Sequence, residues 1–108
     1  MKDALKKIAE KHGIGFRDNG DKVTFYIRFN PDFIWHEASV SFWWGEAVDG
    51  KFNWWRDNIF DGKHRIVGPG YPSYAIFDQK PVTRKEFFRM VEGEVIGLTD
   101  YKQYKYSL

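Results

Sequence analysis

The chain has 108 residues, of which 17 are basic and 15 acidic, with 19% aromatic residues and no cysteine. A domain of this length buries roughly two thirds of its unfolded surface, so its core needs neither a disulfide nor a structural metal. The lack of cysteine excludes disulfides, thiolate metal sites and cysteine nucleophiles, and a net charge of +2 is far from the basic excess typical of duplex DNA binders. We predict a single domain, residues 1–108, without a cofactor.

Residues 3–12 carry apolar side chains at the spacing of an amphipathic helix, and Gly13 follows as a C-terminal cap. This charged start lacks the apolar core of a signal peptide, and no later stretch is long and apolar enough to span a membrane. We therefore expect a cytoplasmic protein with no membrane partner.

Residues 14–29 alternate apolar and polar side chains around Asn19-Gly20, a pair that favours a two-residue type I′ hairpin turn. With this turn, Phe16 would pair with Val23 across the hairpin. The predicted core face holds Ile14, Phe16, Val23, Phe25, Ile27 and Phe29, and the opposite face holds Arg17, Lys22, Thr24, Tyr26 and Arg28.

Four of the five tryptophans form two doublets on either side of Asp49-Gly50, which also favours a two-residue turn. That turn would pair Trp44 with Trp55 and Trp43 with Arg56, while a longer loop around residues 46–51 would shift this register. The predicted core face holds Val40, Phe42, Trp44, Trp55 and Ile59, and the opposite face holds Ser39, Ser41, Trp43, Ala47, Phe52, Trp54, Arg56 and Asn58.

The rest of the chain contains turns, one more strand and a second helix. Glycines and prolines in residues 60–73 indicate turns, and residues 74–77 are typical of a strand. Thr83 and Glu86 have the spacing of a capping box before an apolar helical stripe, and residues 101–106 would form an edge strand or a frayed tail. We predict an α+β fold in which an antiparallel meander of about five or six strands carries an N-terminal and a C-terminal helix on one face.

The face of the sheet that the helices leave uncovered is the candidate binding surface. Large aromatic side chains and arginine dominate the binding energy of interfaces, and an exposed apolar patch usually marks a contact site. Alternatively, the sheet curls or a loop covers this face, so that these aromatic side chains are core and Arg56 makes a cation–π contact with Trp43. The predicted binding residues are Trp43, Phe52, Trp54, Arg56, Tyr26 and Arg28.

Two interpretations treat the chain as a binding protein. The first is a non-catalytic protein-binding domain, of the inhibitor, immunity or adaptor type, whose small size suits a phage or mobile-element protein. Its partner would be another protein, or a second copy in a homodimer. The alternative is a single-stranded nucleic-acid-binding protein, in which bases stack on the aromatic rings while Arg17 and Lys22 contact phosphate.

A third interpretation is a divalent-metal-dependent nuclease. Pro31-Asp32 followed by Asp49-Gly50-Lys51 has the outline of a pattern in which two carboxylates hold the metal and a lysine orients water. However, a hairpin turn makes better use of Asp49 and Lys51. The three histidines lack zinc-site spacing and no serine lies in a nucleophile elbow, so we predict neither a metal site nor catalytic residues.

Overall fold

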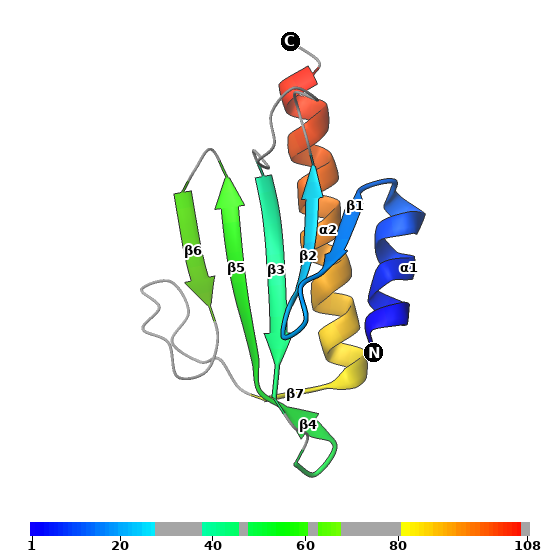
Figure 1. Cartoon of the computed structure of the whole chain (residues 1–108), viewed down its shortest axis with the longest axis vertical. Coiled ribbons are helices and arrows are strands. Elements are labelled where there is room, and N and C mark those ends of the chain that lie inside the picture. The colour runs from blue at the N-terminus through cyan, green and yellow to red at the C-terminus, as the bar shows by residue number, and fades with distance from the viewer. Residues whose placement is uncertain (28–37, 46–47, 61–62, 68–80, 107–108) are drawn as a thin grey trace.

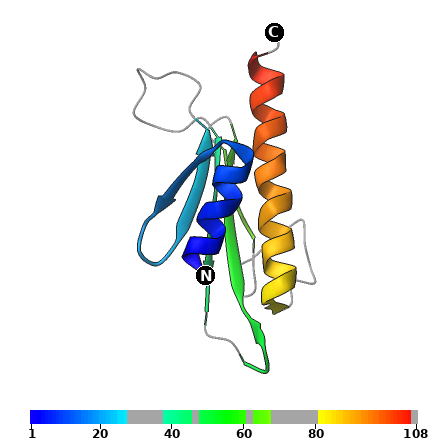
Figure 2. The same ribbon diagram turned by 90° about the vertical axis from the view of Figure 1, so that its right-hand side faces the viewer.

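The computed structural model describes residues 1–27, 38–45, 48–60, 63–67 and 81–106. Five strands form an antiparallel sheet in the order β1-β2-β3-β5-β6, β4 pairs with β7 in a small second sheet, and both helices lie against one face of the large sheet (Figures 1 and 2). The predicted α+β architecture is therefore confirmed. The elements are α1 (Lys2–His12), β1 (Gly15–Asp18), β2 (Val23–Ile27), β3 (Ala38–Trp44), β4 (Lys51–Phe52), β5 (Trp54–Phe60), β6 (Lys63–Val67), β7 (Val82–Thr83) and α2 (Arg84–Tyr106).

Helix α1 begins and ends close to the predicted residues. Leu5 and Ala9, one turn apart, are buried. Gly13 ends the helix in the left-handed conformation, with φ 66°, which glycine adopts without a Cβ clash. Its N–H donates to the Glu10 carbonyl, and the Ile14 N–H donates to the Ala9 carbonyl. Two carbonyls in the last turn of the helix thus receive a hydrogen bond.

The first hairpin has the predicted faces and a different register. Phe16 pairs with Phe25 rather than with Val23, because the turn is centred on Gly20-Asp21. Gly20 has φ 86°, and glycine at the first central position is typical of a type II′ turn. The pairing differs from the predicted one by two residues, and a shift of two keeps every side chain on its own face.

Helix α2 begins as predicted and ends much later. The Glu86 N–H donates to Thr83 Oγ1 at 3.2 Å, as expected for an N-terminal cap. The helix then continues to Tyr106, so the prediction of an edge strand or a tail for residues 101–106 is wrong. Leu98 is fully buried and the Tyr101 ring packs against Phe60 with centroids 5.1 Å apart, so packing extends the helix over the sheet.

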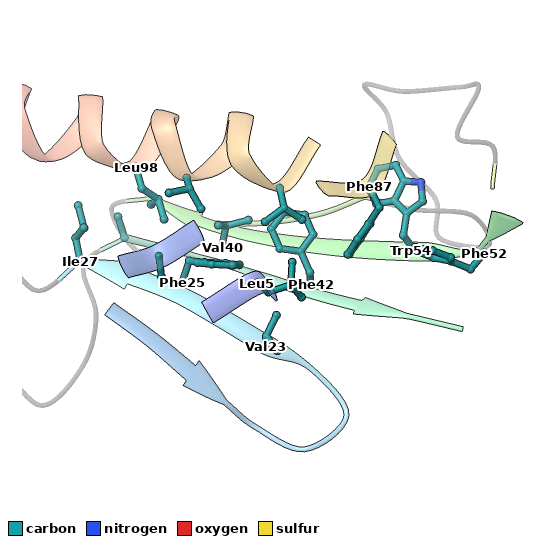
Figure 3. Packing of buried hydrophobic residues seen from close by; sticks show 14 residues of the cluster. Leu5, Val23, Phe25, Ile27, Val40, Phe42, Phe52, Trp54, Phe87 and Leu98 are labelled. Atoms are coloured by element: carbon teal, nitrogen blue, oxygen red, sulfur yellow. The ribbon is translucent and has the colours of Figure 1, made fainter. Parts of the chain in front are cut away.

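The core between the helices and the sheet is built from edge-to-face aromatic rings (Figure 3). Ring centroids lie 6.1 Å apart for Phe25 and Phe42, 5.8 Å for Phe42 and Phe87, and 5.2 Å for Phe87 and Phe52. Phe87 thus connects α2 both to the large sheet and to β4. The rest of the core includes aliphatic side chains that have no exposed surface: Leu5, Val23, Val40, Val91, Val95 and Leu98.

Two strands were not predicted, and some predicted features fall outside the residues that the structure describes. β6 lies in a stretch predicted as turns, where it pairs with β5, and β7 pairs with β4 just before α2. The predicted strand at residues 74–77 and the candidate binding residue Arg28 lie outside the described residues.

Candidate functional site

The second hairpin places the two tryptophan doublets differently from the prediction. Trp44 pairs with Trp54, and Trp43 pairs with Trp55. Residues directly opposite each other in an antiparallel pair point to the same face. β3 therefore has the predicted faces, whereas the faces of β5 are exchanged.

A change of register by one residue causes this exchange. The Asp49-Gly50 turn forms as predicted, with φ values of 54° and 75° and with Val48 paired to Lys51. The sequence has three residues between Trp44 and Val48 and two between Lys51 and Trp54, so the Val48–Lys51 and Trp44–Trp54 pairs differ in register by one. A shift of one residue turns every later side chain of β5 to the other face.

Phe52 and Trp54 consequently belong to the core. They are 5% and 4% exposed and lie with Phe87 at one end of the aromatic cluster (Figure 3). Their predicted place on the uncovered face is wrong, because the register of β5 turns Trp54 toward the helices and β4 packs Phe52 against α2. For these two residues the alternative prediction, in which they are core, holds.

Arg56 also faces the helices. Its Nη1 lies 2.7 Å from Glu94 Oε1 of α2, and its guanidinium lies 5.9 Å from the Trp54 ring centroid. Asn58 Nδ2 donates to the second oxygen, Glu94 Oε2, at 2.9 Å. The Arg56 side chain is 11% exposed, so it connects β5 to α2 inside the molecule, and its predicted place on the binding face is wrong.

The other side of the sheet, away from both helices, is called here the helix-free face. Trp43 and Trp55 are cross-strand neighbours on it, and both are half-buried. Lys22 Nζ lies 5.8 Å from the Trp43 ring centroid, within cation–π range. The described residues on this face are Gly15, Arg17, Lys22, Thr24, Tyr26, Ser39, Ser41, Trp43, Gly45, Trp55, Asp57 and Ile59.

One glycine lets an aromatic ring lie close to the backbone on the helix-free face. A Cβ built on Gly15 would lie 2.4 Å from the ring of Tyr26, its partner across β1 and β2. A Cβ built on Gly45 would lie 4.0 Å from the Trp55 ring, an ordinary contact, so position 45 does not require glycine for this reason. The Tyr26 ring thus occupies space that only glycine leaves open, which holds an aromatic ring close to the backbone of the sheet.

Small hydroxyl residues form the middle of this face. The hydroxyls of Thr24 and Ser41 are 2.9 Å apart, and Asn19 Nδ2 donates to Thr24 Oγ1 at 2.8 Å. Ser39, opposite Tyr26, is 3% exposed. The face thus has an aromatic end at Trp43 and Trp55 and a polar centre whose hydrogen bonds hold β2 against β3.

An exposed ion pair lies at the edge of the sheet. Lys2 Nζ, on α1, contacts Asp18 Oδ1 at 2.9 Å and donates to the Gly20 carbonyl. The hydrogen bond from Lys2, together with one from the Gly20 N–H, lowers the pKa of the Asp18 carboxyl below its ordinary value. These contacts fasten the turn of the first hairpin to α1.

The nuclease residues are not brought together in the described part of the chain. Asp49 and Lys51 lie at the tip of the second hairpin, beside an open hollow of about 560 Å³ that Val48, Asn53 and Pro81 also line. Asp32 lies outside the described residues. Within the described ranges, no three histidine or carboxylate side chains are grouped so that they would hold a metal ion.

Comparisons with protein-family models, curated proteins and solved structures found no match for this chain. Among the helices that the structure describes, none has the length and apolar character needed to cross a membrane.

Proposed function

We propose that this domain is a non-catalytic module that binds another protein through the helix-free face, with Trp43 and Trp55 at the centre of the contact. The observation that carries the proposal is the pairing of these two tryptophans across β3 and β5, on the face away from both helices. Both side chains are half-buried, so part of each ring contacts solvent.

The composition of the face supports this function. Tryptophan and tyrosine are enriched at the energetic centres of interfaces because they bury a large area and lose little conformational freedom. Exposed Arg17 and half-buried Lys22 and Asp57 place both signs of charge around the rings. Aromatic side chains beside polar and charged ones are the usual composition of a reversible protein interface.

Two tryptophan substitutions and one control substitution on α1 test the proposed binding face. Wild-type protein and the Trp55→Ser, Trp43→Ser and Lys7→Ser variants would be immobilised and exposed to lysate of the source cells. A specific partner should be retained by the wild type and by Lys7→Ser, a change on the exposed side of α1. Once the partner is purified, calorimetry should show that each tryptophan change weakens binding by at least about 1 kcal/mol, roughly fivefold in Kd.

Tryptophan quenching by acrylamide would check that the face is accessible. Trp43→Phe and Trp55→Phe should each remove a component of the emission that acrylamide quenches readily. A partner that binds both serine variants as tightly as it binds the wild type would place the interface elsewhere and refute the proposal.

Single-stranded nucleic acid is the second candidate, because Lys22 lies against the Trp43 ring and Arg17 is exposed on the same face. Bases would stack on the rings while the cations contact phosphate. This function predicts that oligonucleotides quench tryptophan emission and that their affinity falls steeply as salt rises. Unchanged emission at low salt would exclude it, whereas salt-dependent quenching would favour it over protein binding.

A further inference from the structure

The outer side of α2, opposite its buried stripe, is a second surface that the proposed function does not use. All the residues of this outer stripe are exposed, and Ile96 is 43% exposed although it is a large aliphatic side chain. Helical periodicity of 3.6 residues places the stripe about opposite to Val91, Val95 and Leu98. The outer stripe consists of Glu86, Arg89, Gly93, Ile96, Gly97 and Asp100.

Two of the three charged residues of the outer stripe are arranged symmetrically with its Gly93 and Ile96. Arg89 and Asp100 are equidistant from a point between residues 94 and 95, and Gly93 and Ile96 are equidistant from the same point. If a second copy of α2 ran antiparallel across this point, Arg89 of each copy would face Asp100 of the other. Ile96 of each copy would then face Gly93 of the other. The surface is thus complementary to itself in charge and in shape, as a two-fold interface requires.

Among the described residues, no neighbour explains the glycine at position 93 or 97. A Cβ built on either residue would meet nothing within 4 Å, and glycine is among the least favourable residues inside a helix. Neither Arg89 nor Asp100 forms a salt bridge among the described residues. A close neighbour supplied by another molecule accounts for both facts, because glycine lets a facing side chain approach the helix backbone.

We propose that α2 is a self-association surface, on which the outer stripe of one copy packs antiparallel against that of a second copy. The ion pairs would lie about 8 Å on either side of the crossing point, at 1.5 Å per residue. A single helix face buries well below the roughly 800 Å² per partner of a stable complex, so the dimer is reversible. It would leave the helix-free faces of both copies open, giving an assembly with two binding faces.

Charge exchange provides the decisive experiment. Sedimentation equilibrium of the wild type from about 10 µM to about 1 mM should show the mass rising from one chain toward two. Arg89→Glu places like charges at both ends of the antiparallel pair, and so does Asp100→Arg. Each variant alone should therefore dimerise at least about tenfold more weakly. An equimolar mixture of the two variants restores opposite charges at both ends and should form a heterodimer.

Two controls separate this effect from general charge or folding effects. Lys7→Glu changes the net charge by the same amount as Arg89→Glu but lies on α1, and it should dimerise like the wild type. Gly93→Gln should weaken the dimer while raising the thermal midpoint, because glutamine favours the helix.

Three results would each overturn the proposal: a wild type that stays one chain over the whole range, variants that dimerise like the wild type, or a mixture that does not associate. Variants that dimerise like the wild type would assign the dimer to another surface, such as the helix-free face. The experiment leaves Trp43 and Trp55 unchanged, so partner binding by the helix-free face is tested separately, with the tryptophan variants.

Discussion

Trp54 and Trp55 are adjacent in the chain and lie in different environments. Trp54 is 4% exposed beneath α2, whereas Trp55 is half-buried on the helix-free face beside Trp43. Because side chains alternate along a strand, any doublet supplies one residue to each face. Composition therefore shows that both faces are aromatic, whereas the register of β5 decides which tryptophan lies on which face.

Truncating each tryptophan of the second doublet should have very different effects on stability. Trp54→Ala should lower the free energy of unfolding by about 3 to 5 kcal/mol, because it leaves a cavity beneath the helices. Trp55→Ala should lower it by less than about 1.5 kcal/mol, since its ring already contacts solvent. Urea unfolding monitored by circular dichroism measures both values. Equal losses, or a larger loss for Trp55→Ala, would show that the faces of β5 are misassigned.

Local sequence patterns predicted the elements better than their register. The capping pair at Thr83 and Glu86 located the start of α2, and alternation located the core face of the first hairpin. Register depends on counting residues between a turn and a pair, so one extra residue is enough to reverse a face. The prediction of the uncovered face was therefore correct for Trp43 and wrong for Trp54 and Arg56.

Long-range packing explains what local patterns missed. The end of α2 is stabilised where Tyr101 contacts Phe60, residues that are far apart in the chain. β7 pairs with β4 across about thirty residues, a contact that a two-residue strand cannot signal by itself. Trp55 belongs to the candidate site because β3 pairs with β5 in a register that the local pattern did not predict.

The next largest effect concerns the polar contact on the covered face. Arg56→Met removes the ion pair with Glu94 and leaves the carboxylate between β5 and α2 with the Asn58 amide. We expect a loss of about 1 to 3 kcal/mol, less than for a fully buried pair because the Glu94 side chain is 26% exposed. A double-mutant cycle with Glu94→Gln would isolate the coupling. A cycle energy near zero would mean that Arg56 acts only through packing on Trp54.

A smaller effect is expected at the glycine beneath Tyr26. Gly15→Ala places a Cβ 2.4 Å from the tyrosine ring, which must move away, so stability should fall by about 1 kcal/mol. In a Tyr26→Ala background the same change should raise stability by about 0.5 kcal/mol, because alanine lowers the entropy of the unfolded chain. Thermal unfolding of the four proteins checks this reversal of sign. The same sign in both backgrounds would show that the ring does not lie over Gly15.

The smallest effect is expected from the surface contact that joins the two helices. Lys11 Nζ and His12 Nε2 contact Glu92 Oε1 at 2.8 and 3.1 Å, and the hydrogen bonds from Lys11 and then His12 lower the Glu92 pKa below its ordinary value. A carboxyl with a lowered folded-state pKa stabilises the fold above its unfolded-state pKa, and that contribution is lost as pH falls through the lowered value. Stability should therefore decline from about pH 5 to pH 3, and Glu92→Gln should make that decline shallower. Urea midpoints of both proteins across this range, with Glu10→Gln as the control on the exposed side of α1, would measure the difference. Parallel curves for the wild type and Glu92→Gln would mean that the exposed contact adds nothing to the pairing of α1 with α2, which would then depend on buried residues such as Leu5 and Ala9.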